Sequence, residues 1–105
     1  MTMPTPEAKV KAKLKKWLQT QGFTYQFWPV QTGYGKAIVD CLAMGPVEGN
    51  ASYAIVWAIE TKREGLTKPT PRQAASMRDL RKGGARTFVV NVDHKGALQW
   101  FEQKD

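Results

Sequence analysis

The run from Tyr53 to Ile59 is uninterrupted apolar sequence, and it leads directly into an acid, Glu60. Its length and its aromatic and β-branched residues predict a buried strand. Side chains alternate between the two faces of a strand, so Glu60 and Lys62 share one face. The pattern therefore predicts a buried strand that ends with a carboxylate and an ammonium on the same side.

Two threonine–proline pairs predict the starts of two helices. Thr5-Pro6 and Thr70-Pro71 each combine an N-cap residue with a proline at the first helical position. A glycine follows each helical stretch and is expected to end it. We therefore expect helices over residues 6–21 and 71–82.

The remaining apolar segments predict one α/β domain over residues 1–105. Strands are expected over residues 23–28, 36–44, 53–62 and 86–92. The turn-forming segment 45–52 predicts an antiparallel hairpin, and segment 96–103 is expected to form a short helix. This order gives a mixed four-stranded sheet flanked by helices.

The charge balance of the chain favours an anionic partner. Sixteen Lys and Arg residues oppose nine Asp and Glu residues, which gives a net charge of +7. Such an excess is typical of proteins that bind nucleic acid. Cys41 has no partner for a disulfide, and the charged stretch from Lys9 to Lys16 is unlike a signal peptide. We expect a cytoplasmic protein of a bacterial or phage-infected cell, with no membrane partner.

A second acid is expected beside Glu60. Asp40 lies within the predicted strand 36–44, and pairing in the hairpin would bring it close to Glu60. Two close carboxylates repel each other unless one is protonated or a cation lies between them. Carboxylate oxygens suit a hard cation such as Mg²⁺. Asp40 and Glu60 are therefore predicted to hold a metal ion.

Each predicted helix carries a polar residue on its inward face. Glu7 falls in the middle of the apolar arc of the first helix, and Gln73 shares the inward face of the second helix with Met77. Both lie in the first turn, from which they could reach Asp40 and Glu60. With Lys62 to orient a water or to neutralise developing charge, and Gln73 to hydrogen-bond a phosphate, the group predicts hydrolysis of a phosphodiester.

These residues resemble the PD-(D/E)XK nuclease superfamily, and more narrowly the virus-type replication-repair nuclease (VRR-NUC) domain. The matching parts are Glu7, GKAIVDCLA (35–43), AIETKREG (58–65), TPRQ (70–73) and GGARTFVV (83–90). The proline that often precedes the first acid of this family is Val39 here. The match runs through nearly the whole chain in order.

The resemblance implies a restriction-endonuclease-like αβββαβ core and a Mg²⁺- or Mn²⁺-dependent endonuclease that cleaves DNA. It makes Asp40, Glu60, Lys62 and Gln73 catalytic, and it adds Glu7 and the backbone carbonyl of Thr61 to the metal site. Stand-alone domains of this size resemble Holliday-junction resolvases, which implies a homodimer acting on branched DNA. The basic residues expected to contact DNA are Lys36, Arg63, Lys68 and Arg72.

Two alternatives stay open at the level of sequence. The first is a non-catalytic DNA-binding module, which the net charge alone would support. The second is a nuclease that uses the same residues on RNA.

Overall fold

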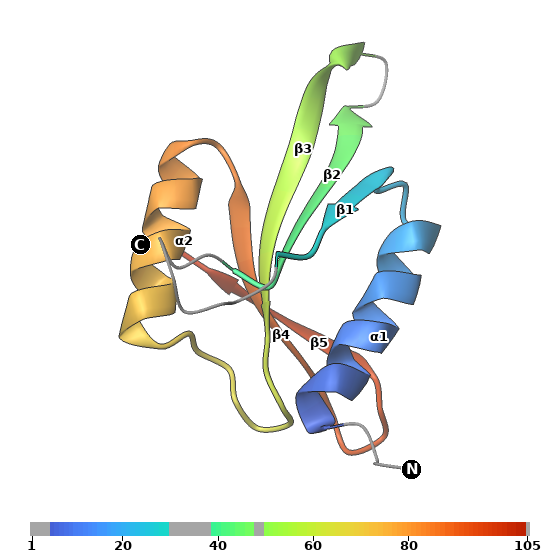
Figure 1. Cartoon of the computed structure of the whole chain (residues 1–105), viewed down its shortest axis with the longest axis vertical. Coiled ribbons are helices and arrows are strands. Elements are labelled where there is room, and N and C mark those ends of the chain that lie inside the picture. The colour runs from blue at the N-terminus through green and yellow to red at the C-terminus, as the bar shows by residue number, and fades with distance from the viewer. Residues whose placement is uncertain (1–4, 30–38, 48–49, 105) are drawn as a thin grey trace.

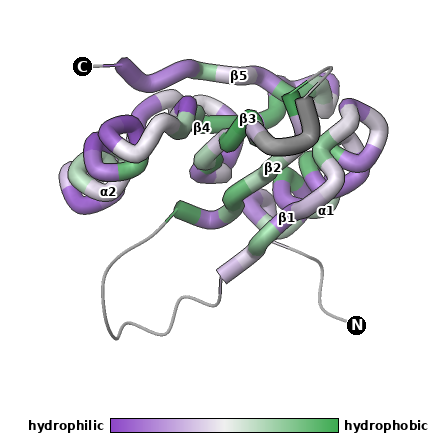
Figure 2. Tube along the Cα trace, turned by 90° about the horizontal axis from the view of Figure 1, so that it is seen from above, coloured by the Kyte–Doolittle hydropathy of each residue, from purple (hydrophilic) through white to green (hydrophobic). Residues whose placement is uncertain are grey.

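The computed structural model describes residues 5–29, 39–47 and 50–104, with only the backbone for residues 50–52. The elements are α1 (Pro6–Thr20), β1 (Tyr25–Phe27), β2 (Cys41–Val47), β3 (Asn50–Thr61), α2 (Pro71–Lys82), β4 (Arg86–Val92) and β5 (Leu98–Gln103). The strands form one sheet in the order β1-β2-β3-β4-β5, parallel between β3 and β4 and antiparallel elsewhere. Helices α1 and α2 lie on opposite faces of this sheet (Figure 2).

Both helices begin as the threonine–proline pairs predict. Thr5 Oγ1 accepts a hydrogen bond from the Ala8 amide at 3.1 Å. Thr70 Oγ1 accepts one from the Gln73 amide at 3.3 Å, and the Gln73 side chain returns a bond to the Thr70 amide. These reciprocal bonds satisfy amides that the first turn of a helix leaves unpaired. Both helices begin at the end of the sheet where β3 ends (Figure 1).

The two faces of the sheet carry separate cores. On the α1 face, the helix buries Val10, Leu14 and Leu18 as its apolar stripe predicts. The sheet contributes Cys41, Ala43, Ile59, Phe88 and Val90 to this core. On the α2 face, Val39, Ala58, Met77 and Val89 form a smaller core. Strand β3 supplies both cores because consecutive side chains point to opposite faces.

The expectation of a helix over 96–103 is wrong, because this segment forms the fifth strand, β5. Its two aromatic residues separate to the two cores, with Trp100 packed on the α1 side and Phe101 on the α2 side. A strand achieves this separation because its consecutive side chains point to opposite faces, whereas consecutive residues of a helix lie only about 100° apart around its axis. The turn before it is built by Asp93 Oδ1, which accepts hydrogen bonds from the amides of Lys95 and Ala97.

The bounds of three predicted strands also change. Strand β1 is limited to Tyr25–Phe27, and β2 begins at Cys41 and continues to Val47, so that Asp40 precedes it. Strand β3 starts at Asn50, which leaves little of the expected turn 45–52. Residues 30–38, including Lys36, lie outside the described part of the chain.

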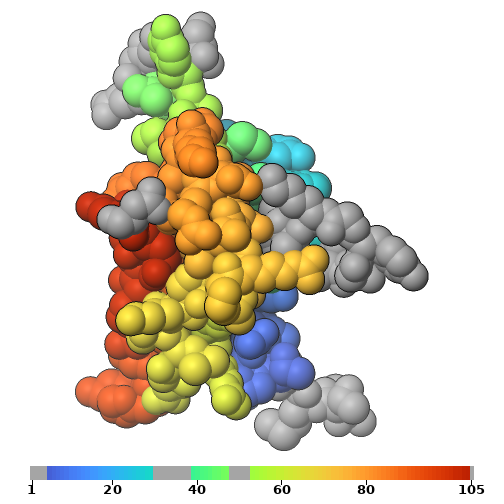
Figure 3. Space-filling view, turned by 90° about the vertical axis from the view of Figure 1, so that its left-hand side faces the viewer, coloured from blue at the N-terminus to red at the C-terminus, as the bar shows by residue number. Residues whose placement is uncertain are grey.

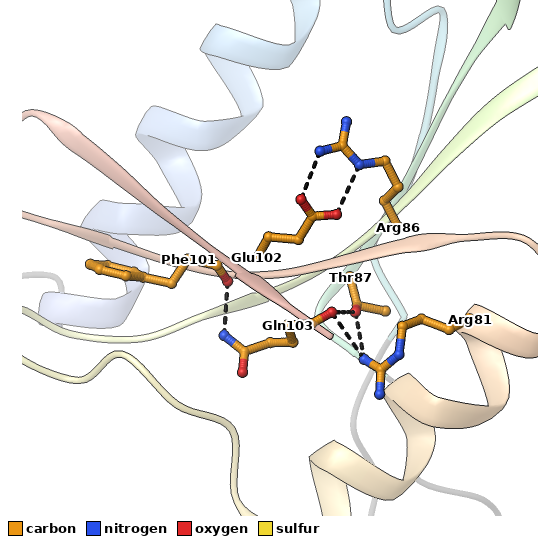
Figure 4. A network of polar contacts seen from close by, with 6 residues as sticks. All are labelled: Arg81, Arg86, Thr87, Phe101, Glu102 and Gln103. Atoms are coloured by element: carbon orange, nitrogen blue, oxygen red, sulfur yellow. Dashed lines mark hydrogen bonds and ion pairs between the residues drawn. The ribbon is translucent and has the colours of Figure 1, made fainter. Parts of the chain in front are cut away.

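Polar contacts fasten β5 and α2 to β4 (Figure 4). Arg86 and Glu102 form a two-bond ion pair with N–O distances of 2.9 and 2.8 Å. Arg81 of α2 donates to Thr87 Oγ1 at 2.7 Å and to the Gln103 carbonyl at 3.2 Å. Together with the Trp100 packing, these bonds fix the edge of the sheet that the sequence analysis did not identify.

Replacing Trp100 by alanine should destabilise the fold, because its ring contacts those of Trp17, Trp57 and Phe88 at centroid distances of 4.9–5.5 Å. We expect a loss of about 3 kcal/mol in the free energy of unfolding, measured by urea denaturation. Tyr53→Ala is the matched control, because that ring is 66% exposed. Equal stability of the two variants would contradict this packing of Trp100.

Candidate functional site

Asp40 is held beside the end of β3 by three contacts. The pairing of Cys41 with Ile59 places Asp40 next to Glu60 in the register of the hairpin. Asp40 Oδ2 accepts hydrogen bonds from the Thr61 amide at 2.9 Å and from Thr61 Oγ1 at 2.7 Å. Its Oδ1 lies 3.7 Å from Lys11 Nζ of α1. One carboxylate thus joins the first helix to the sheet.

Glu60 is almost fully buried, with 5% of its surface exposed. Its Oε1 accepts a hydrogen bond from Gln73 Nε2 at 2.9 Å, whereas its buried Oε2 accepts none from any described residue. Burial, and then the neighbouring charge of Asp40, raise the pKa of Glu60 to about 8, while Lys62 opposes this rise. The structure therefore holds two carboxyl groups together at an electrostatic cost.

Gln73 performs two tasks with one amide group. Its Oε1 completes the cap of α2 by accepting the Thr70 amide at 2.9 Å, and its Nε2 binds Glu60. The two bonds fix the orientation of the amide, because only its nitrogen can donate. The start of α2 is thus tied directly to the buried carboxyl group.

The pair of carboxyl groups fits a Mg²⁺ or Mn²⁺ ion. Buried Glu60 Oε2 offers an unused acceptor, and Asp40 supplies a second oxygen donor close by. Mg²⁺ is commonly held by one or two carboxylates, with water and substrate phosphate as further ligands. The described residues contain no group of three or more His, Cys, Asp or Glu side chains that could hold a metal ion.

Glu7 does not join this pair in the structure. It is exposed, contrary to its place on the predicted inward face, because the buried stripe of α1 begins only at Val10, one turn later. Lys62 is half-buried, and its amide donates to the Val90 carbonyl at 2.8 Å, which extends the pairing of β3 with β4. Of the predicted side chains, the structure brings Asp40, Glu60 and Gln73 into contact.

A basic surface adjoins the pair along the loop between β3 and α2, residues 62–70. Arg63 and Lys68 in this loop, and Arg72 in the first turn of α2, are exposed. Figure 3 shows the loop, in yellow, at the surface between the start of α1 and the turn that joins β4 to β5. Cations placed there could contact a phosphate backbone that enters the site.

Sequence reasoning missed two residues of this region, Lys11 and Asn91. In the sequence, Lys11 is one of several lysines in the first helix, and its contact with Asp40 depends on how α1 docks. Asn91 is the one polar residue within the buried stretch FVVNV (88–92), and it donates to the Leu66 carbonyl at 2.8 Å. A polar side chain in such a stretch indicates a buried hydrogen bond, and this signal is present in the sequence.

The fold is similar to that of Hjc, a Holliday junction resolvase from the archaeal hyperthermophile Archaeoglobus fulgidus. The TM-score is 0.67 over 93% of this chain and 73% of the resolvase, with 19% sequence identity. No family model and no curated protein matches the sequence. The chain therefore has a restriction-endonuclease-like α/β fold, with a fifth strand added to the expected sheet.

The described helices include none that is long and apolar enough to cross a membrane.

The raised pKa of Glu60 predicts a pH-dependent stability in the absence of metal. The folded state keeps this proton to a higher pH than the unfolded state, so stability should fall as the pH rises from about 4.5 to 8. We expect a loss on the order of 5 kcal/mol that Glu60→Gln abolishes, because the proton affinity changes by about 3.5 powers of ten and each tenfold change corresponds to about 1.4 kcal/mol.

The measurement is urea denaturation in EDTA at several pH values. Glu64→Gln is the control, since Glu64 is exposed and should keep the wild-type slope. A Glu60→Gln variant with the same pH slope as the wild type would contradict the raised pKa.

Proposed function

We propose that the chain is a Mg²⁺- or Mn²⁺-dependent endonuclease of the PD-(D/E)XK type, of the VRR-NUC kind, that hydrolyses phosphodiester bonds in DNA. The observation that carries this proposal is the buried Glu60 beside the partly buried Asp40, with an unused oxygen at Glu60 Oε2. A carboxyl group buried beside another one is costly in a purely structural role. The pair is explained by a cation that binds there during function.

Each residue of the site has a task that follows from its contacts. Asp40 and Glu60 would hold the divalent ion, which would supply Lewis acidity toward a phosphate oxygen and toward the attacking water. Thr61 fixes Asp40 through its amide and hydroxyl, and we assign its backbone carbonyl as a further ligand. Gln73 holds Glu60 Oε1, which leaves Oε2 for the ion.

Lys62 lies on the same face of the sheet as Glu60, and it is the positively charged residue nearest to Glu60 in the sequence. We assign it to neutralise the charge that develops on the phosphate, or to orient the attacking water. Glu7 is assigned to the edge of the same metal site, which it would reach by a change of side-chain rotamer from its exposed position.

The proposed substrate is branched DNA, such as a four-way junction. The fold resemblance to an archaeal Holliday junction resolvase supports this choice, as does the net charge of +7. We assign Arg63, Lys68 and Arg72, with Lys36, to the phosphate backbone. A homodimer is also proposed, because a two-fold axis would place two sites on a branched substrate.

A non-catalytic DNA-binding module is the second candidate. The exposed position of Glu7 favours it, since it leaves only two acids side by side among the described residues. A nuclease needs Lys62 and Asp40 for cleavage, whereas a binding module does not, so variants of these two residues distinguish the candidates.

Lys62→Met should abolish most cleavage while retaining metal binding, because Lys62 supplies charge but no ligand. We expect a loss of about 100-fold or more in the cleavage rate, which is typical when one group that stabilises transition-state charge is removed. Asp40→Ala should lose both properties. Cleavage is assayed on linear, flapped and four-way DNA and RNA with Mg²⁺ or Mn²⁺, and metal binding is measured by calorimetry.

Lys82→Met is the matched control, because Lys82 is exposed at the far end of α2. Equal cleavage by the wild type and Asp40→Ala would overturn the nuclease proposal. Metal-independent DNA binding by a wild type that does not cleave would support the second candidate.

Arg63→Ala and Lys68→Ala should each weaken DNA binding without a change of fold. If each side chain contacts one phosphate, each variant should reduce the slope of log K against log salt by about 1. The measurement is fluorescence anisotropy at several salt concentrations, with Asp40→Ala as the background to prevent cleavage. An unchanged slope in both variants, equal to that of the Lys82→Ala control, would exclude this loop from the interface.

A further inference from the structure

Asn91 is a buried polar side chain that the proposed function does not use. It lies near the end of β4 with 1% of its surface exposed. Its Nδ2 donates to the Leu66 carbonyl at 2.8 Å, which ties the loop of residues 62–70 to the sheet. This loop begins with Lys62, so the contact bears on the site.

The other half of the Asn91 amide is unused in the structure. Asn91 Oδ1 is buried and accepts no hydrogen bond from any described residue. A buried acceptor without a partner costs roughly 1–3 kcal/mol. In native proteins most buried polar atoms have a hydrogen-bond partner, so an atom without one calls for an explanation.

The register of the sheet indicates which donor is available. Glu60 pairs with Val89 and Thr61 with Val90 in the parallel ladder. The bond from the Lys62 amide to the Val90 carbonyl continues this pairing, so Lys62 and Asn91 are neighbours. Because paired residues of adjacent strands share a face, both lie on the α2 side of the sheet. Within the described part of the chain, the Lys62 ammonium makes no hydrogen bond or ion pair.

We propose that Asn91 is a positioning residue for Lys62. Its Nδ2 anchors the loop, and in solution its Oδ1 accepts a hydrogen bond from the Lys62 ammonium, which a change of the lysine rotamer brings within reach. An amide suits this task better than a carboxylate would. It leaves the charge of Lys62 available to a phosphate, and it adds no third acid beside Asp40 and Glu60. The catalytic part of this inference rests on the proposed function of Lys62.

Gln103 provides an internal comparison. Its Nε2 donates to the Thr67 carbonyl at 3.4 Å, so it ties the same loop to β5. It lies one strand further from Lys62 in the order of the sheet. Loss of Gln103 should therefore loosen the loop without removing an acceptor from Lys62.

The test compares Asn91→Leu, Asn91→Asp and Gln103→Met with the wild type in two assays. The first is lysine acetylation followed by mass spectrometry, which needs no activity. Because Oδ1 holds the ammonium, Lys62 should react several-fold faster in Asn91→Leu than in the wild type. It should stay protected in Asn91→Asp, which keeps an acceptor oxygen, and in Gln103→Met. Lys68, in the same loop, serves as the reference for general loosening.

The second assay is steady-state cleavage. Asn91→Leu should lower kcat by about 10- to 100-fold with KM nearly unchanged, since the misplaced group acts only in the transition state. Gln103→Met should retain kcat within about threefold of the wild type by the same reasoning. Thermal unfolding followed by circular dichroism verifies that each variant is folded.

Three results would overturn the assignment. These are equal Lys62 reactivity in the wild type and Asn91→Leu, faster reaction of Lys62 in Asn91→Asp, and an equal fall in kcat in Gln103→Met. A wild type that does not cleave DNA would refute the proposed nuclease. Faster acetylation of Lys62 in Asn91→Leu would even then support the contact between Asn91 and Lys62.

Discussion

The burial of Glu60 beside Asp40 is the constraint on which the arrangement of the site depends. Burial alone raises the pKa of a carboxyl group, and a second carboxylate nearby raises it further. The surrounding elements each contribute one contact that keeps this pair in place. Thr61 binds Asp40 within the sheet, Lys11 approaches Asp40 from α1, and Gln73 binds Glu60 from α2.

The contact of Gln73 with the pair depends on where α2 begins. In α2, the proline and the Thr70 cap place Gln73 in the first turn, where its side chain serves both the helix and Glu60. A substitution of Gln73 is therefore expected to lower both the stability of the fold and the activity of the site. A substitution of Lys62 is expected to lower activity without lowering stability, because the fold of the described residues does not depend on a contact of this side chain.

The sequence predicts those parts of the fold whose signals are local. The two helix starts and the strand at 86–92 follow from caps and alternation, and they are confirmed within a residue or so. The strand at 98–103 could not be predicted in this way, because six residues fit a helix or a strand almost equally well. The segment becomes a strand because it pairs with the edge of β4, and local sequence does not show that this edge is available. The same holds for Lys11 and Asn91, whose partners, Asp40 and Leu66, lie far away in the sequence.

The docking of α1 has a consequence for the order in which a new chain can complete its site. Trp17 packs on Trp100, and Lys13 Nζ donates to the Gly96 carbonyl, 83 positions further along the sequence. The helix thus docks in part on β2 and β3 and in part on β5 and the turn before it, which are synthesised much later than the helix. On the ribosome, Asp40 and Glu60 can pair while α1 still lacks these two partners. Until β5 has been synthesised, α1 can dock only through its contacts with the earlier strands, so Lys11 is held beside Asp40 less firmly than in the complete sheet.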